Sequence, residues 1–544
     1  MPPIFIKLSQ NCRWSEILIW NDPAISNIQE AQFMPRISFT RRQALLGSAA
    51  LGTSLAMPSL SRAQSRPLIT HGVMSGDVAH DGAMIWSRAD REAKMLVEWA
   101  TTESMDNAQA VPALAVGTPT DYTGKMALTG LPSDQDIFYR VTMTDLADGT
   151  MSEPTLGKFR TAPMGNRDVS FVWSGDTAGQ GWGIDEDRGG MTTYATMLGH
   201  TPDFFLHSGD TVYADGPLKE EVELDDGTIW KNIVTPAKSK VAETLDEFRG
   251  QHLYNYMDRN VQAFNAAVPI IAQWDDHEVT NNWYPNEVLA SDDRYAVKSM
   301  QTLSARAAHA FHEMMPTRQN LAELMRVYRK VSYGPLLDIF VIDMRTYRGD
   351  NTANTETEAT PFLGAEQMAW LKREMVNSTA TWKVIASDMP IGMMVRDGDT
   401  NMENGANGDG PVLGREQDVA AVLSFIKAAE IANTVWLTAD VHYTAAHHYS
   451  PDRAVFQEFE PFWEFVSGPL HAGTFGPSSY DNTFGPEVRF AKHPEEGKAN
   501  LPPSDGLQFF GKVDIAADTA VMTVRLMDSA DVELWSVELE PKVV

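Results

Sequence analysis

The segment 268–278 joins an apolar run of strand length to a group of ionisable side chains. Val-Pro-Ile-Ile-Ala-Gln-Trp is followed directly by Asp275, Asp276, His277 and Glu278. Adjacent carboxylates repel each other, and burying them unpaired is costly in free energy. The segment therefore predicts a bound cation near the end of a buried strand.

An apolar run that stops at an aspartate occurs repeatedly after residue 168. In an α/β sheet, ligands bind beyond the carboxyl ends of the strands, so such ends can converge on one site. A single aspartate in this position could instead cap a turn or a helix. Three other side chains near these aspartates favour a shared site over separate caps: His277, His442 and Tyr213. The aspartates at these ends are Asp176, Asp210, Asp275, Asp276, Asp343, Asp388 and Asp440.

Two spacings indicate which side chains could share an ion. Tyr213 follows Asp210 within about one turn, so both can address one metal. Asp440 and His442 lie on the same face if the strand continues through them. Two neighbouring metal ions that share the Asp210 carboxylate would neutralise the acidic cluster and explain its charge.

The chain that positions these residues divides into three parts. Residues 1–63 are expected to be a targeting segment. Residues 67–163 alternate short apolar runs with turn signals, and they resemble a fibronectin type III-like β-sandwich. Residues 168–544 alternate strands with helical stretches and end in a C-terminal β-hairpin, which predicts an α/β layer architecture. Helical periodicity is clearest at 241–267, 296–315 and 415–429.

The first part has the order of features found in export signals. Arg41-Arg42 precedes an apolar stretch, 44–57, that is too short for a stable membrane anchor, and Ser61-Arg62-Ala63 offers a cleavage pattern. The arginine pair resembles a twin-arginine signal, so we expect export through the twin-arginine translocase and a periplasmic or secreted protein. The alternative is a chance arginine pair before a core helix. Met34 could be the true start.

Composition limits the possible partners. The 544 residues carry a formal net charge of −29. We expect no nucleic-acid surface, because phosphate backbones need basic partners. A small phosphate-bearing substrate remains compatible, since bound metal ions reverse the local field. The only cysteine, Cys12, lies in the predicted leader, so the exported chain would have no disulfide and no thiolate ligand.

Short motifs carry the aspartates, histidines and tyrosine, and together they resemble a known family. The series Gly175-Asp176, Gly209-Asp210-x-x-Tyr213, Asp276-His277-Glu278 and Asp440-Val-His442 is similar to that of calcineurin-like metallophosphoesterases. Three longer motifs resemble their PhoD-like (alkaline phosphatase D) branch: Trp274-Asp-Asp-His-Glu-Val279, Ile342-Asp-Met-Arg-Thr-Tyr-Arg348 and Leu437-Thr-Ala-Asp-Val-His442. The resemblance implies an α-β-β-α sandwich preceded by the β domain. It also implies metal-dependent hydrolysis of phosphate mono- or diesters.

The resemblance implies two metal positions. The first ion would be ferric iron, with zinc as the alternative, and the second position would hold one or two calcium ions. A second set made only of carboxylates favours a hard ion such as Ca²⁺. Many relatives have a cysteine just before the position of Asp176, where this chain has Ser174-Gly175. By this resemblance, Asp176, Asp210, Tyr213 and His442 would hold the first ion. Asp210 would bridge the two ions, and Asp276, Asp388 and Asp440 would hold the second.

Three further residues are expected to act on the substrate. A hydroxide that bridges the ions would attack phosphorus in line. His277 would protonate the leaving oxygen, with Glu278 orienting its ring. Arg345 is the candidate for a non-bridging phosphate oxygen. Its alternative is a structural ion pair with Asp343 or Asp350.

Two other functions fit parts of the sequence. One is a phospholipase D-like phosphodiesterase that acts on lipid head groups, an activity that also occurs among the D-type relatives. The other is a non-enzymatic calcium-binding surface protein. That second alternative leaves His277 and the pair of Tyr213 and His442 unexplained, since clustered titratable groups favour catalysis.

Overall fold

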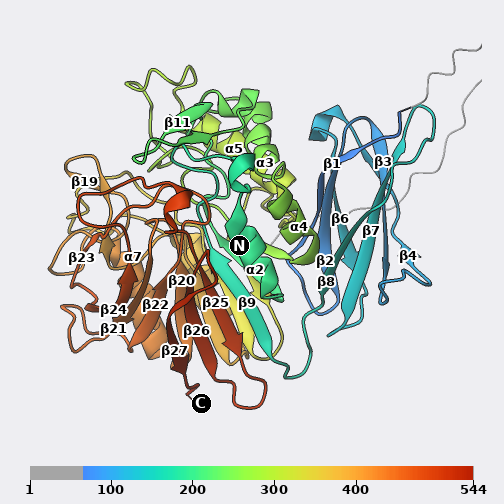
Figure 1. Cartoon of the computed structure of the whole chain (residues 1–544). Helices are drawn as coiled ribbons and strands as arrows, with labels where there is room; N and C mark the ends of the chain where they lie inside the picture. Colours follow the sequence, from blue (N-terminus) through green and yellow to red (C-terminus); the bar gives the residue numbers. More distant parts are fainter. Residues whose placement is uncertain (1–64, 543–544) are drawn as a thin grey trace, which may run out of the picture. The chain divides into compact units, whose positions relative to one another are not determined.

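Two large mixed sheets form the centre of the part of the chain that the structure describes, residues 65–542 of a computed structural model (Figure 1). The predicted leader, 1–63, lies outside these residues. Within them, no helix is long and apolar enough to cross a membrane.

The first sheet has nine strands in the order β27-β26-β25-β9-β10-β13-β1-β2-β6. Its middle strands β9, β10 and β13 run parallel. The strands are β9 (Val169–Ser174), β10 (Phe204–Ser208), β13 (Ile270–Gln273), β25 (Phe509–Ile515), β26 (Met522–Asp528), β27 (Glu533–Leu539), β1 (Ile69–Gly76), β2 (Gly82–Ala89) and β6 (Thr123–Thr129).

The second sheet has seven strands in the order β14-β15-β16-β20-β22-β21-β24. β15, β16, β20 and β22 run parallel. The strands are β14 (Arg329–Ser332), β15 (Leu337–Val341), β16 (Trp382–Ala386), β20 (Thr434–Thr438), β22 (Phe462–Val466), β21 (Thr444–Tyr449) and β24 (Pro486–Lys492).

The two sheets face each other across one apolar core. Phe171 and Leu206 of the first sheet share a buried cluster with Val384 and Leu437 of the second. Four helices cover the other face of the first sheet, and two cover the other face of the second. This is the predicted α-β-β-α order. The helices are α2 (Thr192–Gly199), α3 (Leu245–Asn255), α4 (Arg259–Ala267), α5 (Met300–Met314), α6 (Ala365–Val376) and α7 (Glu416–Ala428).

The helix expected at 241–267 is divided into α3 and α4. A capping box between Thr244 and Glu247 starts α3. Asp258 then starts α4, because its carboxylate accepts hydrogen bonds from the backbone N–H groups of Asn260 and Val261. The predicted periodicity is present, but a new cap interrupts the helix.

The N-terminal strands form two packed sheets, one of which continues into the first large sheet. β1 pairs in parallel with β13, with Gly76 opposite Ile270. The other sheet packs on β2 and β6, with Ile85 and Val97 in the same core. Its strands are β3 (Ala93–Ala100), β4 (Gln109–Ala110), β5 (Leu114–Val116), β7 (Asp136–Asp145) and β8 (Thr155–Arg160).

The C-terminal strands extend the first large sheet. β25 pairs with β9, and β26 and β27 follow in antiparallel order, so the predicted hairpin is part of a three-stranded extension (Figure 1). Three two-stranded ribbons lie in the connecting loops. They are β11 (Glu221–Glu223) with β12 (Ile229–Lys231), β17 (Met393–Met394) with β23 (Ser479–Tyr480), and β18 (Arg396–Asp397) with β19 (Asn401–Met402).

Candidate metal centre and active site

Five of the parallel strands of the two large sheets end just before predicted ligands. Asp176, Asp210 and Asp276 follow β9, β10 and β13, and Asp388 and Asp440 follow β16 and β20. The end of β15 is different. The Asp343 carboxylate accepts hydrogen bonds from the backbone of Arg345 and Thr346 and from the Thr346 hydroxyl, which makes Asp343 a turn cap.

Four of the predicted ligands have a left-handed backbone conformation. The φ angles are 66° for Asp176, 50° for Asp210, 70° for Asp440 and 59° for His442. Such conformations cost about 1–3 kcal/mol each and cluster at functional sites. β20 ends at Thr438, before Asp440, so the condition under which Asp440 and His442 would share a strand face is not met. The turn instead directs them to different clusters.

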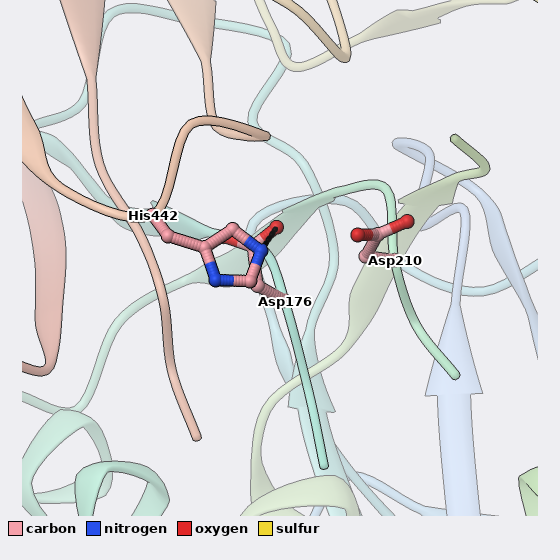
Figure 2. Close-up of side chains that lie close together, drawn as sticks. All are labelled: Asp176, Asp210 and His442. Atoms are coloured by element: carbon pink, nitrogen blue, oxygen red, sulfur yellow. Dashed lines mark ion pairs between the residues drawn. The ribbon is translucent and has the colours of Figure 1, made fainter. Parts of the chain in front are cut away.

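Asp176, Asp210 and His442 form the first cluster (Figure 2). Each offers one ligand atom, and these atoms all lie within 4.8 Å of one another. His442 Nε2 lies 3.7 Å from Asp176 Oδ1 and 2.8 Å from the Tyr213 hydroxyl. His442 Nδ1 donates to the carbonyl of Gly473, which leaves Nε2 as the ligand atom. The four residues expected at the first ion therefore lie together.

The first cluster has the chemistry of a cation site. Both carboxylate oxygens of Asp176 are buried without a hydrogen-bond partner. Burial and the nearby Asp275 raise the pKa of Asp176 well above its usual value, and burial and Asp276 do the same to the pKa of Asp210. A bound cation would remove this cost. Ser174 does not join the cluster, because its hydroxyl donates to the Phe509 carbonyl.

A second and a third cluster adjoin the first. The second contains Asp275, Asp276 and Asp440, and the third contains Asp210, Asp276 and His277. Asp210 thus belongs to the first and third clusters, and Asp276 links the third to the second. This arrangement allows two neighbouring ions with Asp210 between them.

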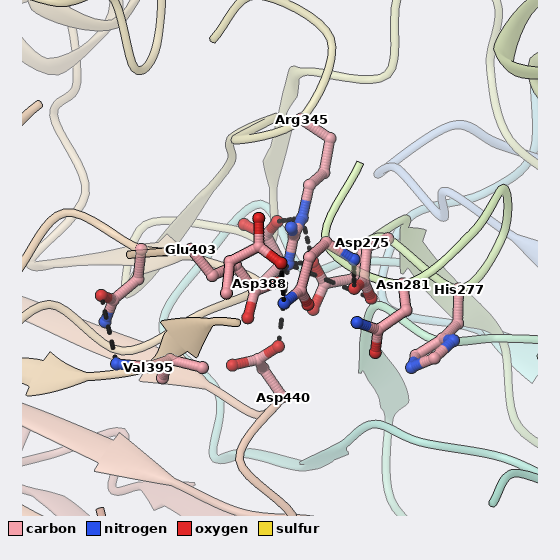
Figure 3. A network of polar contacts seen from close by, with 12 residues as sticks. Asp275, His277, Asn281, Arg345, Asp388, Val395, Glu403 and Asp440 are labelled. Carbon is pink, nitrogen blue, oxygen red and sulfur yellow. Dashed lines mark hydrogen bonds and ion pairs between the residues drawn. The ribbon is translucent and has the colours of Figure 1, made fainter. Parts of the chain in front are cut away.

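Arg345 lies within the second cluster (Figure 3). Its side chain is 0% exposed, and Nη2 lies 2.6 Å from both Asp275 Oδ1 and Glu403 Oε1. The guanidinium is therefore enclosed by carboxylates and exposes no atom to a substrate. The geometry favours the ion-pair alternative for Arg345 over phosphate binding, although the partners are not those expected. Its other carboxylate neighbours within 4.0 Å are Asp276, Asp388 and Asp440.

Asp388 lies behind Arg345 and outside the three clusters. Its oxygens are fully buried, and Arg345 Nε lies 3.6 Å from Oδ2. Burial and Asp275 raise the pKa of Asp388 well above its usual value. Asp275, to which the sequence assigned no role, takes the place beside Asp276 and Asp440 that was expected for Asp388.

His277 is held by Asp215. His277 Nδ1 lies 2.7 Å from Asp215 Oδ1, and the imidazole stacks at 4.2 Å on the Tyr213 ring. Burial lowers the pKa of His277, but Asp215 and Asp276 outweigh burial and raise it to about 10. A cation bound beside Asp276 would reduce this rise.

Glu278 does not orient His277, contrary to expectation. One carboxylate oxygen accepts hydrogen bonds from the backbone N–H and hydroxyl of Thr211, both at 2.6 Å. The other accepts from the backbone N–H of Asp275 at 2.9 Å. Glu278 therefore ties together the loops that follow β10 and β13, and it supports the ligands rather than the imidazole.

A cavity of about 370 Å³ opens over these clusters. Two carboxylates that contact His277 and Arg345 there, Asp215 and Glu403, were not predicted. Asp215 lies two residues after Tyr213, so its place in the same turn was a usable signal. Glu403 lies in a loop rich in Asn and Gly, and only the fold brings it to Arg345. The lining residues are Gln180, Asp210, Asp276, His277, Asn281, Asn282, Val395, Arg396, Glu403, Asp440, Val441, His442, Phe475, Gly476 and Ser478.

The two facing sheets with acidic strand ends at one edge define the class of α-β-β-α metallophosphoesterase folds. Residues 171–526 match the family model of the PhoD-like phosphatase, and residues 54–163 match that of the PhoD-like phosphatase N-terminal domain. The chain belongs to the PhoD-like phosphatase family.

Individual relatives agree with this assignment. Alkaline phosphatase D of Bacillus subtilis (strain 168) is 28% identical over 422 residues, which cover 70% of this chain and 66% of the relative. The chain thus spans slightly less than two thirds of that protein. A solved structure of PhoD has a TM-score of 0.65 at 22% identity, covering 88% of this chain and 90% of that chain.

A more distant structure has the same fold. Purple acid phosphatase PPD1 from yellow lupin (Lupinus luteus) seeds has a TM-score of 0.53 at 11% identity, covering 87% of this chain and 74% of that chain. The predicted fold class is confirmed by these two structures.

Proposed function

We propose that the chain is an exported, metal-dependent hydrolase of phosphoric esters that acts as an alkaline phosphatase or phosphodiesterase. The observation behind this proposal is that three adjoining acidic clusters are linked by Asp210 and Asp276, which line one cavity together with His277. Family membership and the name of the Bacillus relative support the proposal. A calcium-binding surface protein would need the acids, but not an imidazole held by Asp215.

The residues fit two kinds of ion. Asp176, Asp210, Tyr213 and His442 would hold the first, and their phenol, carboxylate and imidazole groups suit ferric iron, with zinc as the alternative. Asp276 and Asp440 would hold calcium, as one or two ions. We assign Asp388 to Arg345 as its counter-ion. When bound, the ions would neutralise phosphate charge and acidify a water that serves as the nucleophile.

His277 would act on the leaving group. Because Nδ1 is bound to Asp215, Nε2 is the ring atom free to face the cavity. Transfer of the Nε2 proton to the leaving oxygen releases a neutral alcohol. The backbone N–H of His277 donates to Asp210 Oδ1 at 3.1 Å, which fixes the imidazole relative to the shared carboxylate.

Hydrolysis of p-nitrophenyl phosphate by the purified protein tests this function. Chelator should abolish hydrolysis and added metal should restore it. On an alkyl phosphate monoester, whose alkoxide leaving group needs a proton, His277→Asn should lower kcat by about 10²-fold or more without altering the unfolding transition. Full turnover in chelator, or full turnover of the alkyl phosphate by His277→Asn, would refute the proposal. Rates on a monoester, a diester and a phospholipid head group, measured on one preparation, would separate phosphatase from lipid phosphodiesterase.

The identities of the ions and the route of export have their own tests. Elemental analysis should find iron and calcium, and a visible tyrosinate–iron band should vanish in Tyr213→Phe. A colourless zinc protein would contradict the assignment of iron. Export rests on the arginine pair, so replacing Arg41 and Arg42 by lysine should retain the protein in the cytoplasm.

A further inference from the structure

We propose that Arg396, on the β18–β19 hairpin, binds a non-bridging oxygen of the substrate phosphoryl group. Of the described residues that line the cavity, Arg396 is the only lysine or arginine. The lining also includes Asp210, Asp276, Glu403 and Asp440. A phosphate anion that enters this cavity therefore meets a guanidinium at Arg396 in addition to the imidazole of His277. The inference rests on the proposed function and adds a specificity residue to it.

The charge of Arg396 is uncompensated. Its side chain is exposed, and no carboxylate of the described residues lies within 4.0 Å of its guanidinium. Its one hydrogen bond is long, 3.5 Å from Nη1 to the Asp399 carbonyl. Arg345 differs on each point, since it is buried among carboxylates. Arg396 is therefore the arginine that is free to pair with an anion, and its planar fork matches a phosphate in geometry.

The hairpin that carries Arg396 is fixed to the acidic clusters. Asp397 accepts hydrogen bonds from the side-chain amides of Asn282 at 3.3 Å and Asn351 at 3.0 Å. The backbone N–H of Asn282 in turn donates to Asp276 Oδ2. A chain of hydrogen bonds thus links the neighbour of Arg396 to a proposed metal ligand.

The same hairpin also contacts the buried Arg345, through Glu403, which follows β19. Arg396 pairs with Met402 across the ribbon, and the backbone N–H of Glu403 donates to the Val395 carbonyl at 2.8 Å. Glu403 then reaches Arg345. One short hairpin therefore places a carboxylate on the buried arginine and a free guanidinium at the cavity. The hairpin contacts fix the backbone that carries Arg396, and this reduces the entropy lost when the side chain binds an anion.

The test uses the full chain loaded with metal, and it compares Arg396→Gln, Arg396→Lys and wild type. Arg396→Gln should raise KM for p-nitrophenyl phosphate about tenfold, with kcat within about threefold. Calorimetric binding of inorganic phosphate should weaken by a similar factor, and Arg396→Lys should recover part of both losses. Arg489→Gln is the matched control, because Arg489 is an exposed arginine on β24 outside the cavity lining, and it should behave as wild type.

The outcomes distinguish this inference from the proposed function. Unchanged KM and phosphate affinity in Arg396→Gln, with an active wild type, would overturn the role of Arg396 and leave the hydrolase intact. A loss confined to substrates that carry a second anionic group would also overturn it, because p-nitrophenyl phosphate has only the phosphoryl group. An inactive wild type would refute the hydrolase, and phosphate calorimetry would still decide whether Arg396 binds the anion.

Discussion

At the scale of single residues, the contact between Asp215 and His277 controls the proposed proton transfer. Asp215→Asn removes the charge that stabilises a protonated imidazole and that fixes which ring nitrogen faces the cavity. We expect kcat to fall about 10²-fold while KM changes by less than about threefold. Steady-state kinetics on an alkyl phosphate monoester, whose leaving oxygen needs the proton, measures both. Asp187→Asn, at an exposed position, is the control. An unchanged kcat would remove Asp215 from the mechanism.

The ion pairs of Arg345 lead to a prediction about stability rather than catalysis. Carboxylates surround it, so Arg345→Met leaves buried negative charge without a counter-ion. We expect the free energy of unfolding in chelator to fall by about 3–5 kcal/mol, and metal to restore part of it. Urea unfolding with and without metal measures this. The control is Arg489→Met, which removes an exposed ion pair. An unaltered midpoint would mean that the surrounding carboxyl groups are protonated.

At the scale of elements, the loop after β22 determines the position of Asp176. A Cβ atom on Gly468 would overlap with Asp176 Oδ2. Gly468→Ala should therefore displace this carboxylate, lower the metal content of the first site and reduce kcat by about 10²-fold. Elemental analysis and kinetics measure the two effects. At Gly165 an added Cβ meets nothing within 4 Å, so Gly165→Ala should retain both metal and activity.

The start of α7 gives the protein a pH-dependent stability. Burial and the nearby Asp481 raise the pKa of Glu416 from 4.5 to about 9. The folded state then holds a proton that the unfolded chain releases. The stabilisation is complete below about pH 4.5 and is lost as the pH rises towards 9. Glu416→Gln should therefore be more stable than wild type at pH 9, by about 1–3 kcal/mol, and similar at pH 4.5.

Urea unfolding at both pH values measures this difference. Glu366→Gln is the control, because Glu366 is an exposed glutamate in the first turn of α6. If Glu416→Gln and wild type lose stability equally between pH 4.5 and pH 9, the carboxyl group of Glu416 is already ionised in the folded protein.

Local patterns predicted the elements that carry the site. An apolar run that stops at an aspartate identified β9, β10, β13, β16 and β20, because burial and turn chemistry act over a few residues. The same pattern also selected Asp343, which caps a turn, since a cap and a ligand use the same residue type. The cap at Asp258 was visible in the sequence, but the helical periodicity on both sides concealed it.

Long-range contacts could not be predicted in this way. Glu403 reaches Arg345 across 58 positions of sequence, and nothing in its Asn- and Gly-rich loop marks it. That Asp275, and not Asp388, lies beside Asp276 and Asp440 has a similar cause. Which of these two buried carboxylates lies beside Asp276 and Asp440 depends on where the guanidinium of Arg345 lies, and this is set by the packing of one sheet against the other.

At the scale of the whole described molecule, Asp77 joins the N-terminal strands to both large sheets. Its backbone N–H donates to the carbonyl of Ile270 in β13, at 3.1 Å. Its carboxylate accepts two hydrogen bonds from Arg329 of β14, at 2.8 and 2.9 Å, and one from the backbone N–H of Arg318. The N-terminal sheets also share one apolar core with the large sheets. Residues 65–542 should therefore unfold together.

Asp77→Ala tests this coupling. The change leaves the Arg329 guanidinium, which is only 12% exposed, without its carboxylate. We expect the free energy of unfolding to fall by about 3–5 kcal/mol. Because the core is shared, unfolding should remain one transition, so tryptophan fluorescence and phosphatase activity should be lost at the same urea concentration. Asp81→Ala, at an exposed position in the β1–β2 turn, should change neither. Two separate transitions in wild type would show that the N-terminal sheets fold independently of the strands that carry the metal centre.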